Sequence, residues 1–446
     1  MNLKTILNNK NSNVHKSEIA KGAIYTFSVK GIGIVLNYVL IYIINENYGH
    51  KGFGIYSLFI SSLLFLSYVG SIGLNVSLLR YIGQFNSEIS KGHLNNLKRV
   101  VKYAYQIVLV SSLALSGFLF VFSETISIHV LDDVGYKEIL KFTAFIAPLY
   151  IFHVINVELL RGLKKILLSE VFRSTLLPLI CIVVLTLFSS QFKDDFFPSY
   201  VYGFAVLIVL CISLFTIGKK LNFNLKTIDS SELKFKELMN VSSAMLVSGL
   251  GVYLIDNIGL FLIQGFYDEE AVGIFSIVMK FTFVTTLILT GINTISAPKF
   301  SELFWLDNQI ELKNAVAFSA KILFYLSTPV FLILILFPEE LLSIFSVEAS
   351  YAARMLIIIS IGQYVNVLSG SVGLFLNMTG NQKVNRNIIL LTTFMALILN
   401  YVLIQYMGIV GIAWATMISL IFLNASRAIY IYKKFKIKMF YVPFSK

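Results

Sequence analysis

Long apolar runs alternate with short polar segments along almost the whole chain. An α-helix needs about 20 apolar residues to cross the roughly 30 Å hydrocarbon core of a bilayer. Helices also satisfy their own backbone hydrogen bonds in lipid, so runs of this length predict membrane-spanning helices. We predict twelve of them, with approximate bounds 22–44, 55–79, 101–122, 140–160, 169–190, 198–218, 239–264, 271–296, 317–337, 351–375, 387–405 and 409–432.

The composition agrees with this pattern. Hydrophobic residues make up 57% of the 446 residues and charged residues only 13%, and the mean hydropathy is +0.79. A soluble domain keeps roughly a quarter of its residues charged to cover its surface. The chain is therefore expected to be an all-α integral membrane protein with most of its surface facing lipid.

Positive charge is distributed unevenly between the two sides of the predicted helices. The net charge is +12, and of the 36 lysines and arginines 29 fall on the side of the termini, five on the opposite side and two, Lys30 and Lys280, inside the membrane. Cytoplasmic loops of membrane proteins carry such an excess of positive charge. We therefore expect both termini in the cytoplasm, an even number of crossings, and no nucleic acid among the partners.

A sequence motif recurs in the second half of the chain. Gly54-Ile55-Tyr56-Ser57 opens the second predicted helix, and Gly273-Ile274-Phe275-Ser276 opens the eighth at an offset of 219 residues. The same offset pairs Arg80 with Lys299 and Asn37 with Asp256. Six helices per repeat is an even number, so both repeats enter the membrane from the same side. This predicts two six-helix lobes in a parallel pseudo-two-fold repeat, an arrangement known in transporters.

The repeat also predicts the domain organisation. We place an N-terminal six-helix lobe over residues 1–218 and a C-terminal six-helix lobe with a basic cytoplasmic tail over residues 239–446. The lysine-rich segment 219–238 is expected to form the cytoplasmic loop that connects them.

Three ionisable residues lie deep inside predicted helices: Lys30, Lys280 and Asp256. At 1.5 Å per residue, Lys30 lies about 12 Å into its helix, and Lys280 lies near the middle of its own. Such residues are costly in lipid and usually face a bundle interior or a water-filled cavity. Two cations at this depth indicate an anionic substrate, such as a phosphate or pyrophosphate head group.

Lys30 belongs to a polar stripe at helical spacing with Gly33 and Asn37, and the glycines at 31 and 33 predict close helix packing. Two alternatives remain open. Lys30 can snorkel to the cytoplasmic interface instead, and Asp256 can be either the structural counter-ion of a lysine or a functional residue. Separately, Glu158 and Arg161 are one turn apart at a helix end and are expected to form a local pair.

The sequence contains no nucleophile–base pair and no phosphate-binding loop, and its five histidines are scattered without a second ligand at metal spacing. We therefore expect no catalytic residue, no metal and no cofactor, and we do not expect an enzyme.

Several segments resemble a known family in order and spacing, and together they cover most of the chain. They resemble the signatures of the bacterial oligosaccharide or O-antigen flippases (Wzx-type), within the multidrug/oligosaccharidyl-lipid/polysaccharide exporter superfamily. The segments are Gly52–Phe59, Leu78–Tyr81, Ala271–Ser276, Ala297–Glu302, Met378–Lys383, Leu399–Ile404 and Gly408–Ala413.

The resemblance implies a V-shaped bundle that moves undecaprenyl-pyrophosphate-linked oligosaccharide across the bacterial cytoplasmic membrane for O-antigen or capsule assembly. Its partners would be this lipid-linked substrate, membrane lipids, and the polysaccharide polymerase and glycosyltransferases. Members often carry basic residues in a central cationic cavity, which Lys30 and Lys280 match. The candidate substrate-binding residues are Lys30, Lys280, Asn37, Asp256 and Arg80.

One alternative is a cation-coupled multidrug extruder of the same fold, with Asp256 as its coupling carboxylate. Repulsion between the membrane lysines and a cationic drug counts against it. A membrane-bound polymerase or ligase is a more distant alternative, because no catalytic constellation is present.

Overall fold

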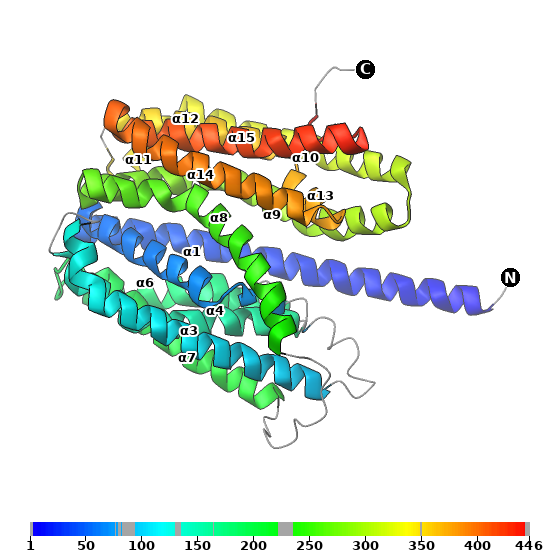
Figure 1. Ribbon diagram of the computed structural model, residues 1–446, viewed down its shortest axis with the longest axis horizontal. Coiled ribbons are helices and arrows are strands. Elements are labelled where there is room, and N and C mark those ends of the chain that lie inside the picture. The colour runs from blue at the N-terminus through cyan, green and yellow to red at the C-terminus, as the bar shows by residue number, and fades with distance from the viewer. Residues whose placement is uncertain are drawn as a thin grey trace. The chain divides into compact units, whose positions relative to one another are not determined.

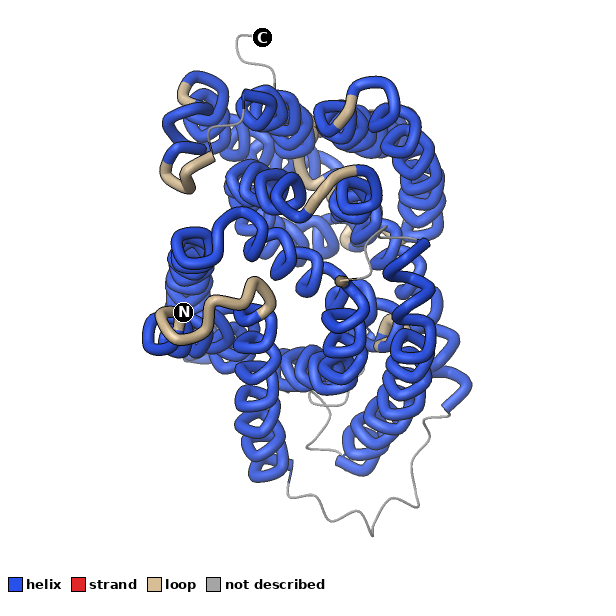
Figure 2. The backbone as a smooth tube through the Cα atoms, turned by 90° about the vertical axis from the view of Figure 1, so that its left-hand side faces the viewer, coloured by secondary structure: helices blue, strands red, loops and turns tan. Residues whose placement is uncertain are grey.

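The computed structural model describes residues 3–75, 77–78, 82, 94–129, 135–163, 165–221, 235–347 and 350–441. Over these residues the chain consists of helices and short connections without a strand (Figures 1 and 2). Eleven helices within these ranges are long and apolar enough to cross a membrane. The protein is therefore an all-α integral membrane protein, as the hydropathy pattern predicts.

The first two predicted helices are joined in one element, α1 (Leu3–Gly70). Its apolar part, Ser28–Gly70, contains 43 residues and would be about 65 Å long as a straight helix, roughly twice the thickness of the hydrocarbon core. Gly49 interrupts the helical geometry with φ 66° and ψ −175°, a conformation that glycine adopts without a Cβ penalty. The span Ser28–Gly70, one of the eleven, thus contains the first two of the twelve predicted membrane crossings.

The chain divides into two compact units. The first unit comprises residues 1–49, 59–128 and 133–246, and the second comprises 50–58, 129–132 and 247–446. The short segment 50–58 therefore belongs to the second unit although α1 continues on both sides of it.

In the first unit, α1 is followed by α3 (Leu94–His129), α4 (Tyr136–Gly162), α5 (Ile166–Glu170), a π-helical turn η2 (Val171–Thr175), α6 (Leu176–Phe188) and α7 (Phe197–Leu221). Helix α4 packs along α7, which also packs along α6 (Figure 1). Asn156 of α4 links three helices, because its amide donates to Ser213 Oγ of α7 at 2.9 Å and accepts from Tyr105 Oη of α3 at 2.7 Å.

The π-helical turn has a local cause in the sequence. Pro178 lacks the N–H group that would bond to the carbonyl of Ser174 in a regular helix. The predicted helix 169–190 is consequently divided into α5, η2 and α6. Single π turns inside α-helices occur frequently at functional sites.

The second unit contains most of α8 (Phe235–Phe266), then α9 (Glu269–Trp305), α10 (Gln309–Leu336), α11 (Pro338–Ser343), α12 (Ser350–Leu368), α13 (Val372–Met378), α14 (Gln382–Met407) and α15 (Ile409–Phe435). Helix α15 packs against α12 and α14, and α9 packs against α10 and α12. Asp268 caps α9 by accepting from the backbone N–H of Ala271 at 2.9 Å, which satisfies one otherwise free donor of the first turn.

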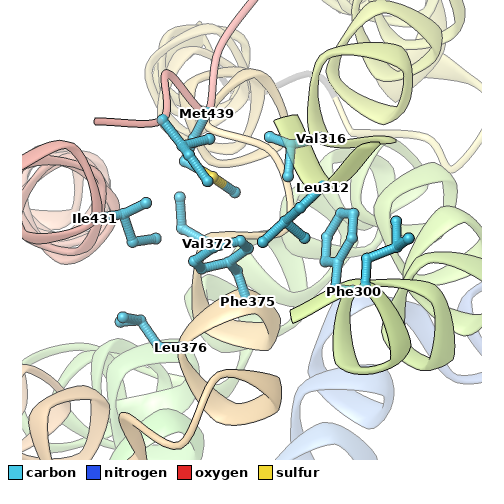
Figure 3. Packing of buried hydrophobic residues seen from close by; sticks show 10 residues of the cluster. Phe300, Leu312, Val316, Val372, Phe375, Leu376, Ile431 and Met439 are labelled. Carbon is cyan, nitrogen blue, oxygen red and sulfur yellow. The ribbon is translucent and has the colours of Figure 1, made fainter. Parts of the chain in front are cut away.

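A buried apolar cluster holds one end of this unit together (Figure 3). Phe300 of α9, Phe375 of α13 and Ile431 of α15 are 1%, 0% and 0% exposed. Met439, beyond the end of α15, packs into the same cluster. The segment after the last helix is therefore part of the core of the second unit.

Candidate functional site

Lys30 forms an ion pair in the first unit with Glu170, the last residue of α5. The distance from Lys30 Nζ to Glu170 Oε1 is 3.8 Å, and the two side chains are 41% and 4% exposed. The carboxylate is buried while the ammonium keeps an accessible side. Lys30 can therefore still meet a ligand from that side.

The predicted polar stripe of α1 is partly a packing face. A Cβ on Gly33 would lie 2.7 Å from the carbonyl oxygen of Ser174, so glycine lets α1 approach η2 closely. Among the described residues, Gly31 has no side chain or other element within 4 Å of its Cβ position, so the structure shows the predicted packing role for Gly33 and not for Gly31. Asn37 is exposed, and its amide donates to the carbonyl of Gly33 at 2.8 Å.

A second ionic group lies at the end of α4. Arg173 Nη2 is 2.6 Å from Glu158 Oε1, and Arg161 Nη1 is 3.8 Å from Glu158 Oε2. The Glu158 side chain is 8% exposed, whereas the Arg173 and Arg161 side chains are 40% and 37% exposed. Here too a buried carboxylate holds cations that remain accessible. The predicted pair of Glu158 and Arg161 is confirmed.

Arg173 itself was not predicted as a site residue. The charge count treats it as a loop cation, although it lies five residues into the predicted helix 169–190. The depth argument that selected Lys30 therefore applied to Arg173 as well. Glu170, just before the π turn, and Arg173, within it, contact different partners, Lys30 of α1 and Glu158 of α4.

The first unit also contains a polar cavity of about 210 Å³ beside this ionic group. Its lining residues are Leu64, Ser67, Tyr68, Asn75, Tyr150, His153, Val154, Val157, Glu158, Arg173, Leu177 and Tyr202. His153 is 3% exposed and Glu158 is 6% exposed. His153 Nδ1 and Glu158 Oε2 are buried and make no hydrogen bond within the described part of the chain.

The other predicted site residues lie elsewhere. Lys280 of α9 and Asp256 of α8 are both exposed side chains of the second unit. Asp256 forms no ion pair with another residue of this unit that the structure describes. Arg80 lies outside the described residues.

Arg427 is a second residue that the sequence analysis missed. The charge count includes it in the cytoplasmic tail, but it lies inside α15, eight residues before the end of the helix. Its side chain is buried, and Nε donates to Asn385 Oδ1 of α14 at 2.8 Å. The predicted span 409–432 already contained this position, so depth again was the available signal.

Comparisons with known proteins relate the chain to membrane transporters. Residues 19–304 match the family described as "Polysaccharide biosynthesis protein", and residues 244–402 match the MatE family. Over 188 residues the chain is 28% identical to a "Probable low-salt glycan biosynthesis flippase Agl15" of Haloferax volcanii. This match covers 41% of the chain and 39% of that relative.

Solved structures of the multidrug/oligosaccharidyl-lipid/polysaccharide exporter (MOP) superfamily share the fold of this chain. An inward-facing multidrug resistance MATE family transporter aligns with a TM-score of 0.72 at 14% identity, over 93% of this chain and 98% of that one. A MOP superfamily transporter from Pyrococcus furiosus, whose structure is described as having a binding pocket of reversed polarity, aligns with a TM-score of 0.63 at 13% identity, over 93% and 94%. At this identity the similarity shows the fold alone.

Proposed function

We propose, because the chain belongs to the polysaccharide biosynthesis protein family, that it translocates a lipid-linked glycan across a membrane. The specific substrate we propose is undecaprenyl-pyrophosphate-linked oligosaccharide, moved across the bacterial cytoplasmic membrane for O-antigen or capsule assembly. The flippase similarity of the Haloferax volcanii relative supports a glycan as cargo. The protein acts as a carrier without a covalent step.

The observation that carries this proposal is the pair of accessible cations in the first unit. Lys30 and Arg173 are each held by a carboxylate that is itself buried. Desolvating a charge is costly unless it is paired, so these carboxylates offset part of the cost of keeping two cations at membrane depth. The accessible side of Lys30 remains available to phosphate oxygens, which basic side chains bind through short charge-assisted hydrogen bonds, and the accessible side of Arg173 remains available to polar groups of the glycan.

Lys280 is the proposed cation of the second unit. Lys30 and Lys280 contact the pyrophosphate, and Asn37, Asp256 and Arg80 complete the proposed contact set. The polyprenyl chain stays in lipid while the head group crosses, because only the head group is costly to bring into hydrocarbon. Alternating access by two six-helix lobes, residues 1–218 and 239–446, then moves the head group from the inner to the outer leaflet.

Reconstituted transport tests this proposal. Proteoliposomes containing undecaprenyl-pyrophosphate-linked oligosaccharide would be assayed for glycan reaching a membrane-impermeant lectin. Lys30→Gln and Lys280→Gln should each lower the initial rate about tenfold or more, since a hydrogen bond to a charged group is lost. Arginine at either position should retain more activity than glutamine. Lys193→Gln, in an exposed turn, is the matched control, and native rates in both site variants would contradict the proposed contacts.

The MatE match over residues 244–402 supports a second candidate, a cation-coupled multidrug extruder. Asp256 lies within that match and would be its coupling carboxylate. Efflux of a cationic dye from cells expressing the protein distinguishes the two functions. Efflux that is lost in Asp256→Asn, together with absent glycan transport, would establish the extruder.

A further inference from the structure

The cavity of the first unit has the size and polarity of a site for one small polar group. Its volume of about 210 Å³ lies below the roughly 300–1,000 Å³ of pockets that enclose drug-sized ligands. The lining comes from α1, α4, η2, α6 and α7 together with Asn75. The cavity can therefore take a single ring-sized group, and it is too small for an oligosaccharide or a polyprenyl chain.

Two buried polar atoms indicate that the cavity is built for a ligand. His153 Nδ1 and Glu158 Oε2 make no hydrogen bond with the residues that the structure describes, and both side chains line the cavity. Buried polar groups in native proteins are nearly always hydrogen-bonded, because leaving one unsatisfied costs free energy. The Arg161 guanidinium is 3.8 Å from Glu158 Oε2 and too far to donate a hydrogen bond to it. A ligand in the cavity can supply a hydrogen bond to each of the two atoms.

The mixture of donors and acceptors selects the chemistry of that ligand. Arg173 only donates hydrogen bonds and an ionised Glu158 only accepts them, whereas Asn75 does both. A sugar hydroxyl also donates and accepts, so a ring with several hydroxyl groups can match all three. A phosphate would be repelled by Glu158 and a metal cation by Arg173. The 2.6 Å contact between Arg173 and Glu158 fixes the two groups before any ligand arrives.

The aromatic residues of the cavity fit the same ligand. The Tyr150 ring lies 6.4 Å from the Tyr202 ring and 6.2 Å from the His153 ring, measured between centroids. Tyrosine presents an apolar ring with a polar tip. The C–H face of a sugar ring can pack on the tyrosine ring, and the sugar hydroxyls can form hydrogen bonds with the tyrosine hydroxyl.

We propose that this cavity binds one neutral monosaccharide ring of the lipid-linked glycan and thereby contributes to sugar specificity. The proposal rests on the proposed function. It assigns two binding roles to the first unit: Lys30 binds the anionic pyrophosphate, and the cavity binds and selects a sugar ring. The two binding positions are adjacent along the chain. Glu170, just before the π turn, contacts Lys30, and Arg173, three residues later, lines the cavity.

Saturation-transfer NMR on the purified full-length protein in nanodiscs tests the cavity. The probes are free neutral hexoses and N-acetylhexosamines, with inorganic pyrophosphate and sodium ion as separate competitors. Asn75→Ala and His153→Phe should weaken binding of the preferred sugar about tenfold, the loss expected for one or two hydrogen bonds. Tyr150→Phe removes one hydroxyl and keeps the ring, so it remains usable if another variant fails to fold. Lys193→Gln, at an exposed position between α6 and α7, should leave sugar binding at the wild-type level.

Three outcomes would overturn the proposal: no monosaccharide binding at the highest soluble concentrations, sugar binding that all three cavity variants retain, or competition for the cavity by pyrophosphate or sodium ion. Transport assays keep this failure separate from failure of the proposed function. If the wild-type protein moves lipid-linked glycan while the cavity variants show unchanged rates and sugar preference, only the cavity assignment is wrong. If the wild-type protein moves no glycan, the proposed function itself fails.

Discussion

Gly54 and Gly273, the first residues of the two copies of the repeated motif, pack backbone against backbone in the second unit. A Cβ on Gly54 would overlap the carbonyl oxygen of Glu269, and a Cβ on Gly273 would overlap that of His50. His50 and Glu269 are themselves separated by 219 residues, the offset of the repeat. The contact is therefore reciprocal, as expected of equivalent positions around a two-fold axis.

Alanine at Gly54 or Gly273 should destabilise the protein. The atoms in the way belong to backbone, which cannot move aside as a side chain can, so each substitution should cost at least the roughly 1–3 kcal/mol of typical overpacking. Thermal unfolding of the purified protein measures the effect. Gly31→Ala and Gly117→Ala are the controls, since among the described residues no side chain or other element lies within 4 Å of either Cβ position.

The two glycine substitutions should also be coupled. Once Gly54→Ala has separated the two segments, Gly273→Ala should cost less than it does alone, because both act on one contact. Strictly additive losses in the double variant would show that the two positions do not share a contact.

The pair of Lys30 and Glu170 allows folding and transport to be separated. Lys30→Gln leaves a carboxylate that is 4% exposed without its partner and should lower stability, although the 41% exposure of Lys30 keeps the loss to about 1–2 kcal/mol. The exchanged variant Lys30→Glu with Glu170→Lys should recover the melting temperature and remain defective in transport, because the accessible position then carries the wrong charge. Recovery of both properties would mean that Lys30 is structural.

Asn385 should be required for stability because of Arg427. Asn385→Leu removes the acceptor of a hydrogen bond from a buried guanidinium and should cost about 1.5–3 kcal/mol. Arg427→Met together with Asn385→Leu should recover most of this loss, since replacing a buried polar pair by apolar residues is often neutral. A double-mutant cycle of unfolding midpoints checks this, and equal losses in the single and double variants would contradict it.

The predicted topology can be tested with reporter fusions. A reporter that is active only in the cytoplasm should work after Lys446 and be silent after Lys193, which lies in the turn between α6 and α7. The charge asymmetry of 29 to five is the physical reason. The opposite pattern would reject the predicted orientation.

The sequence alone determined the helices, because lipid offers the backbone no hydrogen-bond partners and an apolar run of sufficient length must therefore be helical. The predicted span 198–218 corresponds to α7 (Phe197–Leu221), and 271–296 lies within α9 (Glu269–Trp305). The repeat was also readable, because its glycines are needed at a close backbone contact and other residues would not fit there.

Tertiary structure decided which polar residues meet. Arg173, in the π turn, contacts Glu158 of α4, fifteen residues away along the chain. Hydropathy indicates how deep in the membrane a residue lies. It does not indicate which neighbouring helix that residue faces. The cavity depends on this missing information most strongly, since its lining spans residues from Leu64 to Tyr202 on separate helices. Those residues become neighbours only when the helices pack, and the helix pairing cannot be read from a single sequence.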